Sequence, residues 1–286
     1  MLTVLAMFAF AGNSLLCRLA LKGTAIDPAT FTSVRVLSAA LALWLILRGR
    51  NGPRAIGGNW YSAFALFAYA ATFSFAYVGV AAGTGALILF GTVQATMIGY
   101  ALWAGERLRA PQWAGVALAL AGLVGLVLPG IAAPPLLSSL LMLAAGIAWG
   151  VYSLRGRGAE DPTATTAGNF LRAIPFTAAV SLLMTLTARA PVSFDRAGLA
   201  YATLSGALTS GAGYVIWYAA LKELKAASAA TVQLSVPLIA AAGGIVLLDE
   251  PLTPRLVASA VAILGGIALV IVRRQTRPAD SPRSRR

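Results

Sequence analysis

The feature that most constrains this chain is a series of ten apolar stretches, each long enough to cross a lipid bilayer as a helix. Crossing ~30 Å of hydrocarbon takes about 20 apolar residues, so ten helices use about 200 residues of the chain. We therefore predict an all-α polytopic membrane protein of ten transmembrane helices, joined by short turns rich in Gly and Pro. The stretches run over Leu2–Leu21, Pro28–Leu47, Trp60–Val80, Gly83–Ala104, Pro111–Leu128, Pro135–Leu154, Thr163–Thr187, Gly198–Leu221, Ala226–Leu248 and Arg255–Val272.

Composition excludes the other broad classes. Hydrophobic residues make up 59% of the chain and charged residues 11%, whereas an average soluble domain is about 25% charged. A soluble domain of 286 residues has too little interior for that excess, and a disordered chain would be poor in apolar residues. The single cysteine, Cys17, excludes an intrachain disulfide.

The net charge of +13 is interpreted as an orientation signal, so no nucleic-acid partner is predicted. With the N-terminus placed inside, 15 of the 22 Lys and Arg residues fall in inside segments and 4 in outside segments. Basic residues concentrate in cytoplasmic loops. Both termini are therefore predicted to be cytoplasmic. Residues 274–286 are predicted to form a basic cytoplasmic tail, for which a solvated orientation signal is favoured over binding to anionic headgroups.

The two halves of the sequence resemble each other. A shift of 144 residues without gaps aligns Glu106 with Glu250 and Gly105-Glu106-Arg107-Leu108 with Asp249-Glu250-Pro251-Leu252. Each half holds five spans, and because five is odd the second half must enter the membrane from the opposite side. We predict two inverted five-helix repeats, residues 1–130 and 131–273, an architecture common in secondary transporters.

These motifs resemble the drug/metabolite transporter superfamily in its EamA-type branch. The resemblance rests on GERL at 105–108, DEPLT at 249–253, WGVYSLRGR at 149–157, Arg35 and Pro237, and it extends from Leu2 to about Val272. The first repeat departs from the pattern with Val93 where the second has Pro237, and FAFAGNS stands where many relatives have a Trp. Within the branch, the chain is most similar to YddG-type bacterial exporters of amino acids and metabolites.

Chemistry-bearing residues are scarce inside the spans. The chain has no His, and none of its nine Asp and Glu residues lies mid-span. A proton-driven pump usually carries such a residue in the membrane, so we predict transport without a carboxylate proton relay. No catalytic set, metal-ligand cluster or cofactor motif appears, which argues against an intramembrane enzyme.

Arginine and amide side chains within spans are candidates for substrate contact. Arg172 lies ten residues past Pro162, near the midplane, and is equally compatible with a substrate carboxylate or backbone carbonyls as its partner. Gln94 is equally compatible with substrate contact and with helix packing, because the resemblance implies that its span lines a central cavity. For Asn169 and Gln233, hydrogen bonding between helices is favoured. Asn13 is the remaining amide candidate within a span.

Aromatic residues supply the remaining candidates. Tyr69 on the third span and Tyr214 and Trp217 on the eighth lie deep enough to line a cavity, as do Trp149 and Tyr152 on the sixth. An aromatic cavity with a few amides suits an amphipathic or aromatic solute. Packing between helices is an equally good explanation for any one of these rings.

Five further residues are assigned structural roles. Pairing of Arg35 with carbonyls or a neighbouring helix is favoured over a substrate carboxylate. Glu106 and Glu250 are expected to cap or pin the adjoining helix starts rather than to contact substrate. Pro175 and Pro237 are expected to kink their helices in mid-span. Arg18, near the outer end of the first span, is expected to snorkel to the interface.

The prediction that combines these patterns is a monomeric permease of the bacterial inner membrane, with the lipid bilayer and a small-molecule substrate as its partners. It would export small metabolites, including aromatic or apolar amino acids, by alternating access. Multidrug efflux and nucleotide-sugar transport are alternatives on the same fold. A channel is the alternative from another class, although neither a ring of charges nor a filter loop appears.

Overall fold

The computed structural model describes residues 1–50, 56–130, 132–187, 194–221 and 232–275, and this part of the chain is helical without β-strands. Seven of its helices are long and apolar enough to cross a membrane. The helices are α1 (Leu2–Gly23), α2 (Pro28–Arg48), α3 (Trp60–Tyr77), α4 (Ala82–Trp103), α5 (Ala110–Val127), α6 (Leu136–Arg155), α7 (Pro162–Thr187), α8 (Arg196–Leu204), η1 (Ser205–Ala212), α9 (Gly213–Leu221), α11 (Ser235–Leu248) and α12 (Pro254–Gln275).

The seven long helices fall on seven of the predicted spans. The helix α3 and the run α8–η1–α9 coincide with the third and eighth, and α11 covers the second part of the ninth. The count of ten membrane-crossing helices stays a prediction. Arg54, Lys222, Lys225 and the tail from residue 276 onward lie outside the described residues.

Helix starts show why the acidic residues avoid the middle of the spans. Asp27 accepts hydrogen bonds from the backbone N–H groups of Ala29 and Thr30 at the start of α2. Asp161 does the same at the start of α7, and Asp195 accepts from Gly198 at 2.8 Å in α8. The first N–H groups of a helix lack intrahelical acceptors, and a carboxylate supplies them. Several of the few acids therefore serve the ends of helices.

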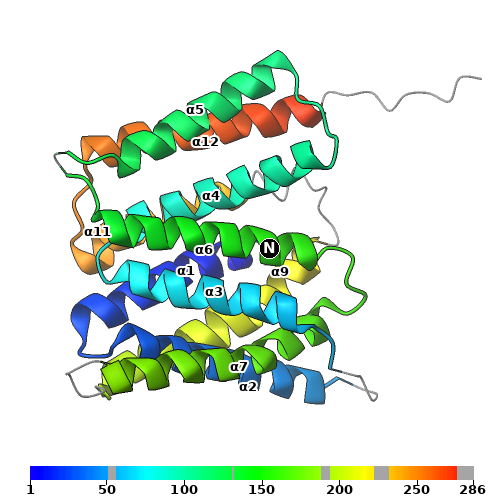
Figure 1. Cartoon of the computed structure of the whole chain (residues 1–286), viewed down its shortest axis with the longest axis vertical. Coiled ribbons are helices and arrows are strands. Elements are labelled where there is room, and N and C mark those ends of the chain that lie inside the picture. The colour runs from blue at the N-terminus through cyan, green and yellow to red at the C-terminus, as the bar shows by residue number, and fades with distance from the viewer. Residues whose placement is uncertain (51–55, 131, 188–193, 222–231, 276–286) are drawn as a thin grey trace, which may run out of the picture.

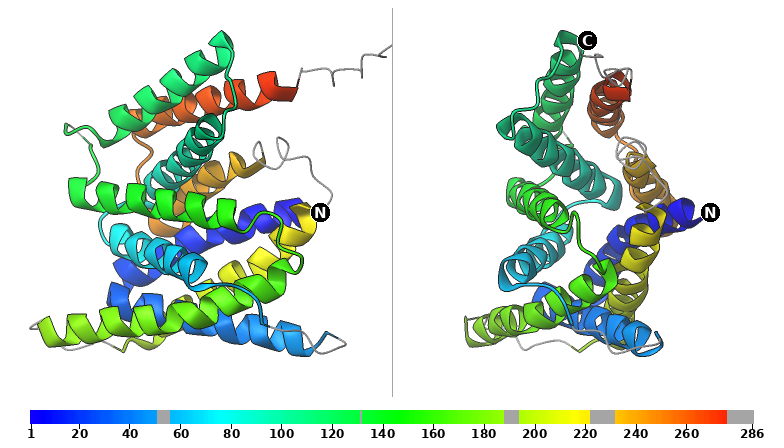
Figure 2. Two further views of the ribbon diagram at one scale, coloured as in Figure 1. Left: turned by 45° about the vertical axis from the view of Figure 1, so that its right-hand side comes forward. Right: turned by 90° about the vertical axis from the view of Figure 1, so that its right-hand side faces the viewer.

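The helices run side by side in one bundle, and their connections alternate between its two ends (Figure 1). The connections α1–α2, α3–α4, α5–α6 and α11–α12 lie at one end. The connections α2–α3, α4–α5 and α6–α7 lie at the other, together with the start of α1 and the end of α12. The pair α5 and α12 packs together at one edge, beyond α4 (Figure 2).

Contacts between helices come in matched pairs. The contact of α3 with α6 has a counterpart in that of α9 with α1, and the contact of α4 with α6 has one in α11 with α1. Likewise α3 packs on α7 as η1 packs on α2. The pairs α2–α7, α4–α11 and α5–α12 are their own counterparts when the first five spans are exchanged with the last five.

The eighth predicted span contains a π-helix, η1, continuous with α8 and α9. A π-helix has a wider turn than an α-helix and is frequently found at functional sites. Gly206 within it lies against the Arg35 carbonyl and the Ser38 hydroxyl of α2, with no space for a side chain. The wider turn and the small residues thus bring the backbones of η1 and α2 close together.

The α5–α12 pair depends on the same close approach. A Cβ atom added at Gly115 of α5 would lie 2.6 Å from the carbonyl oxygen of Gly266 in α12, and one added at Gly266 would meet the Gly115 carbonyl in turn. Lipid tails are as apolar as the side chains of a helix, so burial of apolar surface does not drive helices together in a membrane. Close backbone packing of this kind is therefore a main source of helix association.

We expect Gly266→Ala to destabilise the protein by about 1–3 kcal/mol, because the added methyl group must push α5 away. Gly265→Ala is the matched control, since nothing lies within 4 Å of its added Cβ atom. Thermal unfolding of the purified variants in detergent measures the difference. Equal melting temperatures for both variants would contradict the packing.

Candidate functional site

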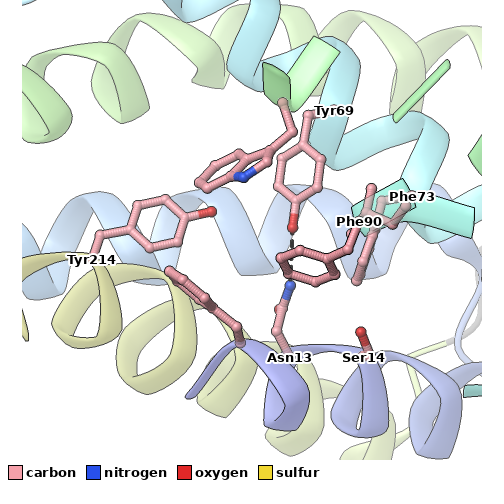
Figure 3. A pocket seen from close by; sticks show the side chains of 9 residues that line it. Asn13, Ser14, Tyr69, Phe73, Phe90 and Tyr214 are labelled. Atoms are coloured by element: carbon pink, nitrogen blue, oxygen red, sulfur yellow. Dashed lines mark hydrogen bonds between the residues drawn. The ribbon is translucent and has the colours of Figure 1, made fainter. Parts of the chain in front are cut away.

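A small cavity lies at the centre of the bundle, between the first and second halves of the chain. It is lined by Phe10, Asn13 and Ser14 of α1, Tyr69 and Phe73 of α3, Leu89 and Phe90 of α4, Trp149 of α6 and Tyr214 of α9 (Figure 3). Its volume of about 10 Å³ holds no more than one water molecule. The cavity as described is therefore too small for a substrate.

Asn13 is the polar centre of the cavity. Its amide nitrogen donates to the Tyr69 hydroxyl at 3.1 Å, the contact drawn as a dashed line in Figure 3. Its amide oxygen lies 2.7 Å from the Ser205 hydroxyl and 3.2 Å from the Thr209 hydroxyl, both on η1. An amide buried in an apolar bundle needs such partners. The π-helix supplies them, so Asn13 joins α1, α3 and η1.

Arg35 lies directly behind this group and is only 1% exposed. Its Nη2 donates to the Tyr69 hydroxyl at 3.1 Å and its Nε to the Ser210 hydroxyl at 3.3 Å. The guanidinium carbon stands 5.2 Å from the centre of the Tyr69 ring and 4.8 Å from that of Phe73. Its Nη1 has no partner among the described residues. An arginine keeps its charge in any protein environment, so this is a fixed cation near the cavity.

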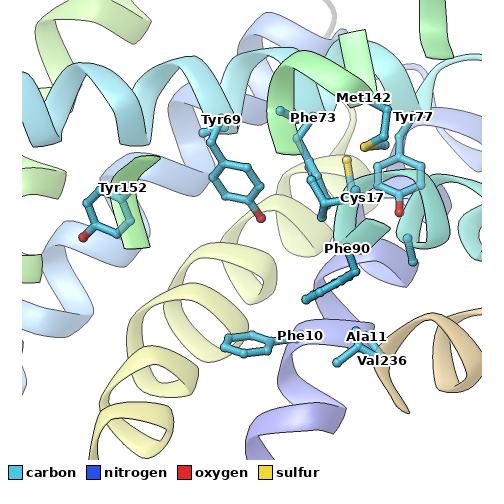
Figure 4. Close-up of a cluster of buried hydrophobic side chains, with 14 of the residues drawn as sticks. Phe10, Ala11, Cys17, Tyr69, Phe73, Tyr77, Phe90, Met142, Tyr152 and Val236 are labelled. Atoms are coloured by element: carbon cyan, nitrogen blue, oxygen red, sulfur yellow. The ribbon is translucent and has the colours of Figure 1, made fainter. Parts of the chain in front are cut away.

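Aromatic rings form the other wall of the cavity. The ring of Trp149 lies 4.8 Å from that of Tyr69, 5.0 Å from Tyr214 and 5.5 Å from Tyr152, measured between centroids. Phe10 contacts Trp149, Tyr214 and Trp217 edge to face. We call Phe10, Tyr69, Trp149 and Tyr214 the aromatic cage. Around it the closely packed apolar core continues through α1 and α3 (Figure 4).

Four predicted site residues therefore line the cavity: Asn13, Tyr69, Trp149 and Tyr214. Trp217 and Tyr152 lie behind the cage and contact it through Phe10 and Trp149. Gln94 is buried on α4, one helical turn beyond the lining residue Phe90. Gln233 is half-buried shortly before α11.

The structure places Arg172 and Asn169 outside the cavity. Arg172 donates from Nη1 to the carbonyl oxygens of Gly57 at 2.8 Å and Gly168 at 3.0 Å. Asn169 accepts from the backbone N–H of Asn59 at 3.0 Å. The sequence left a substrate carboxylate or backbone carbonyls as partners of Arg172, and the structure shows backbone carbonyls. Both side chains hold the segment before α3 against α7.

Two groups of lining or supporting residues were not singled out in the sequence. Phe10 and Phe90 are ordinary apolar residues within spans, and nothing local marks them, whereas Phe73 shares a helical face with Tyr69. Ser205 and Thr209 are four residues apart and hence on one helical face, a signal that the sequence does contain. Arg35 was recognised as an embedded cation, but its place beside the cavity follows only from the packing of α2 on η1.

A second polar cluster closes one end of the bundle. Glu250, in the connection before α12, accepts from Arg18 Nε at 2.9 Å and from the backbone N–H of Ala82 at 2.7 Å. Arg18 also donates to the carbonyl oxygens of Tyr77 and Val78 at the end of α3. Glu250 is 7% exposed and Arg18 13%. Arg18 thus lies at one end of the bundle, where a buried carboxylate and two backbone carbonyls accept its hydrogen bonds.

Comparison with known proteins identifies the family of this chain. A model of the EamA-like transporter family matches residues 136–272. The uncharacterized protein PA1977 of Pseudomonas aeruginosa is 55% identical over 280 residues, covering 98% of this chain and 96% of the relative. The chain belongs to the EamA-like transporter family. A crystal structure shares the fold, with a TM-score of 0.65 and 22% identity, covering 95% of this chain and 98% of that one.

Membership of the EamA-like family makes this chain a multi-pass membrane transporter of the drug/metabolite type, and proteins of this family are transporters rather than enzymes. The matched relative carries no described function, and a fold similarity at 22% identity gives no substrate. The substrate must therefore be argued from the cavity.

Of the two repeat-related glutamates of this EamA-like chain, Glu250 does not cap α12, the helix that follows it. Thr253 caps α12 through the N–H of Leu256, and Gln112 accepts from the N–H of Arg109 at the start of α5. Glu250 caps α4 instead, a helix of the other half. Glu106 is exposed at the opposite end of the bundle.

The prolines differ from each other in position. Pro175 lies inside α7, as its place in the span predicts. Pro237 lies in the first turn of α11, because that helix begins at Ser235. Residues 232–233 are also helical and a turn at Leu234 separates them from α11, so the helix is interrupted just before Pro237.

We expect Arg18→Ala to destabilise the EamA-like fold by about 3–5 kcal/mol, because it leaves the buried Glu250 carboxylate without its cation. Arg50→Ala is the control, since its contact with Asp161 is 3.5 Å long and the two side chains are 35% and 27% exposed. An exposed pair contributes about 0–1 kcal/mol. Thermal unfolding in detergent compares the two variants, and similar losses would contradict a special role for the buried pair.

Proposed function

We propose that this protein is a secondary transporter of the bacterial inner membrane that exports small metabolites, among them amino acids with aromatic or apolar side chains. Transport proceeds by alternating access through the central cavity, and one chain suffices. The observation that carries the proposal is the cavity itself, where Asn13 and Tyr69 of the first half face Trp149 and Tyr214 of the second.

The aromatic cage matches the substrate class. Ring centroids 4.8–5.0 Å apart around Trp149 present faces and edges to a planar or apolar group. Asn13, Ser14 and the tyrosine hydroxyls add polar atoms at the same place. Binding sites for small amphipathic molecules combine an apolar wall with a few polar groups in this way. The resemblance to YddG-type exporters of amino acids agrees with this match.

Alternating access explains why the cavity is closed. A volume of about 10 Å³ excludes an amino acid, so the lining halves must separate before a substrate enters. The matched helix contacts support two inverted repeats, residues 1–130 and 131–273, whose conformations exchange between the halves. The tail 274–286 follows as a cytoplasmic extension.

Charge distribution supports the orientation. Arg48 ends α2, Arg155 ends α6, and Arg107 and Arg109 lie between α4 and α5, all at the end of the bundle where α1 begins. The excess of arginine assigns this end to the cytoplasm. The Arg18–Glu250 pair then lies at the opposite, outer end, where it ties α1 and the α3–α4 connection to the segment before α12. We propose that this pair holds the outer side closed in the described conformation.

Reconstitution tests the function directly. Liposomes with purified protein and internal unlabelled phenylalanine should take up external labelled phenylalanine, and the uptake should saturate. Currents of single open channels without saturable exchange would favour a pore instead. Flat uptake across a panel of amino acids would refute the substrate class while leaving the family assignment intact.

Trp149→Ala should raise the half-saturation concentration for phenylalanine about tenfold. The reason is that the aromatic cage loses the ring that contacts Tyr69 and Tyr214. Two aromatic contacts together contribute about 1–3 kcal/mol. Trp103→Ala is the control, since Trp103 is 83% exposed at the end of α4. Trp149→Phe should recover part of the affinity. An unchanged half-saturation concentration in folded Trp149→Ala would place the site elsewhere.

A further inference from the structure

Arg35 is a fixed cation without an acidic partner in the described structure. The ion pairs among the described residues join Arg18 to Glu250 and Arg50 to Asp161, and neither includes Arg35. Its stabilisation comes from two neutral hydroxyls and two aromatic faces. A charge buried in apolar surroundings is costly unless it is paired. The site therefore holds an excess positive charge of one.

Two donors at this place lack an acceptor. The Nη1 of Arg35 is buried without a hydrogen-bond partner among the described residues. The Tyr69 hydroxyl accepts from both Asn13 and Arg35, so its own hydrogen is left to be donated. Within the described part of the chain, no acceptor receives that hydrogen. A carboxylate has two acceptor oxygens that fit a guanidinium N–H together with a neighbouring hydroxyl.

The lining residues offer no acidic partner to an ammonium group. No Asp or Glu is among the residues that line the cavity, and the amide oxygen of Asn13 already has two hydroxyls as neighbours. The guanidinium of Arg35 already lies beside the Tyr69 and Phe73 rings. A second cation close to it would be repelled. The electrostatics of the cavity are thus one-sided.

We propose that the cavity recognises its substrates through a carboxylate bound by Arg35 and the Tyr69 hydroxyl, and that an α-ammonium group contributes nothing to recognition. The substrate class is therefore the aromatic or apolar compound that carries one carboxylate, of which the amino acid is one member. This inference rests on the proposed function and deepens it. The apolar body of the substrate lies in the aromatic cage, and its charged end replaces the missing counter-ion.

A set of four ligands with the same phenyl ring isolates the two charges. The ligands are phenylalanine, 3-phenylpropionate, 3-phenylpropionamide and phenethylamine, titrated by calorimetry onto the purified, unmodified protein in detergent at neutral pH. We expect 3-phenylpropionate to bind at least as tightly as phenylalanine. The neutral amide should bind about 10- to 100-fold more weakly, since it loses a charge-assisted hydrogen bond. Phenethylamine should bind more weakly still.

Two variants assign the effect to Arg35. Arg35→Gln should abolish the preference for 3-phenylpropionate over its amide, whereas Arg35→Lys, which keeps the charge but not the fork of donors, should retain part of it. Arg50→Gln, at the end of α2, should leave the preference unchanged. If Arg35→Gln does not fold, the ligand series on the unmodified protein still decides the proposal.

The outcomes separate this inference from the proposed function. If phenylalanine exchanges in liposomes but the amide or the amine binds as tightly as the acid, the carboxylate inference is wrong and the transport proposal stands. If folded Arg35→Gln keeps the preference, another group binds the carboxylate and the assignment to Arg35 is wrong. If no ligand of the series binds and phenylalanine does not exchange, both proposals fall.

Discussion

The structure depends on how a permanently charged guanidinium is held in the middle of an apolar bundle. Arg35 reaches this position because Gly206, which has no side chain, lets η1 lie directly against the backbone of Arg35 in α2. The wider turn of η1 supplies Ser210 to Arg35 and Ser205 to Asn13. The centre of the molecule is therefore a connected set of hydrogen bonds through α1, α2, α3 and η1. Because hydrocarbon offers no substitute partners, loss of one member would leave another unsatisfied.

This central network and the Arg18–Glu250 ion pair stabilise the same fold in different ways. Around the cavity, polar atoms of the first half meet rings and hydroxyls of the second, and spare donors remain for a ligand. At the end of the bundle opposite the start of α1, Arg18 and Glu250 satisfy each other as well as the ends of α3 and α4. In a contact that closes one end, every polar group should have a partner. In a site that receives a substrate, some polar groups should lack a partner until the substrate binds. The contrast between the two clusters fits a carrier that opens one side at a time.

Local sequence signals identified the elements well where the cause is local. The runs of apolar residues correspond to the helices, and the acids of the turns lie at helix starts because the first N–H groups need acceptors. Roles that need a distant partner were harder to predict. Glu250 caps a helix 168 residues away in the chain, and Arg18 reaches it across 232 residues. No periodicity within one span contains that information.

The sequence by itself determined the class of the protein, the positions of most helices and the scarcity of charge within them, because the hydrophobic requirement of a bilayer acts on each span separately. It also contained the internal likeness that predicts two related halves. The tertiary structure alone decided which embedded side chains meet. It directed Arg172 to backbone carbonyls and Arg35 to the cavity, although both are arginines within apolar helices. The reason is that partners for a buried polar group come from neighbouring helices, and helix packing is a property of the whole chain.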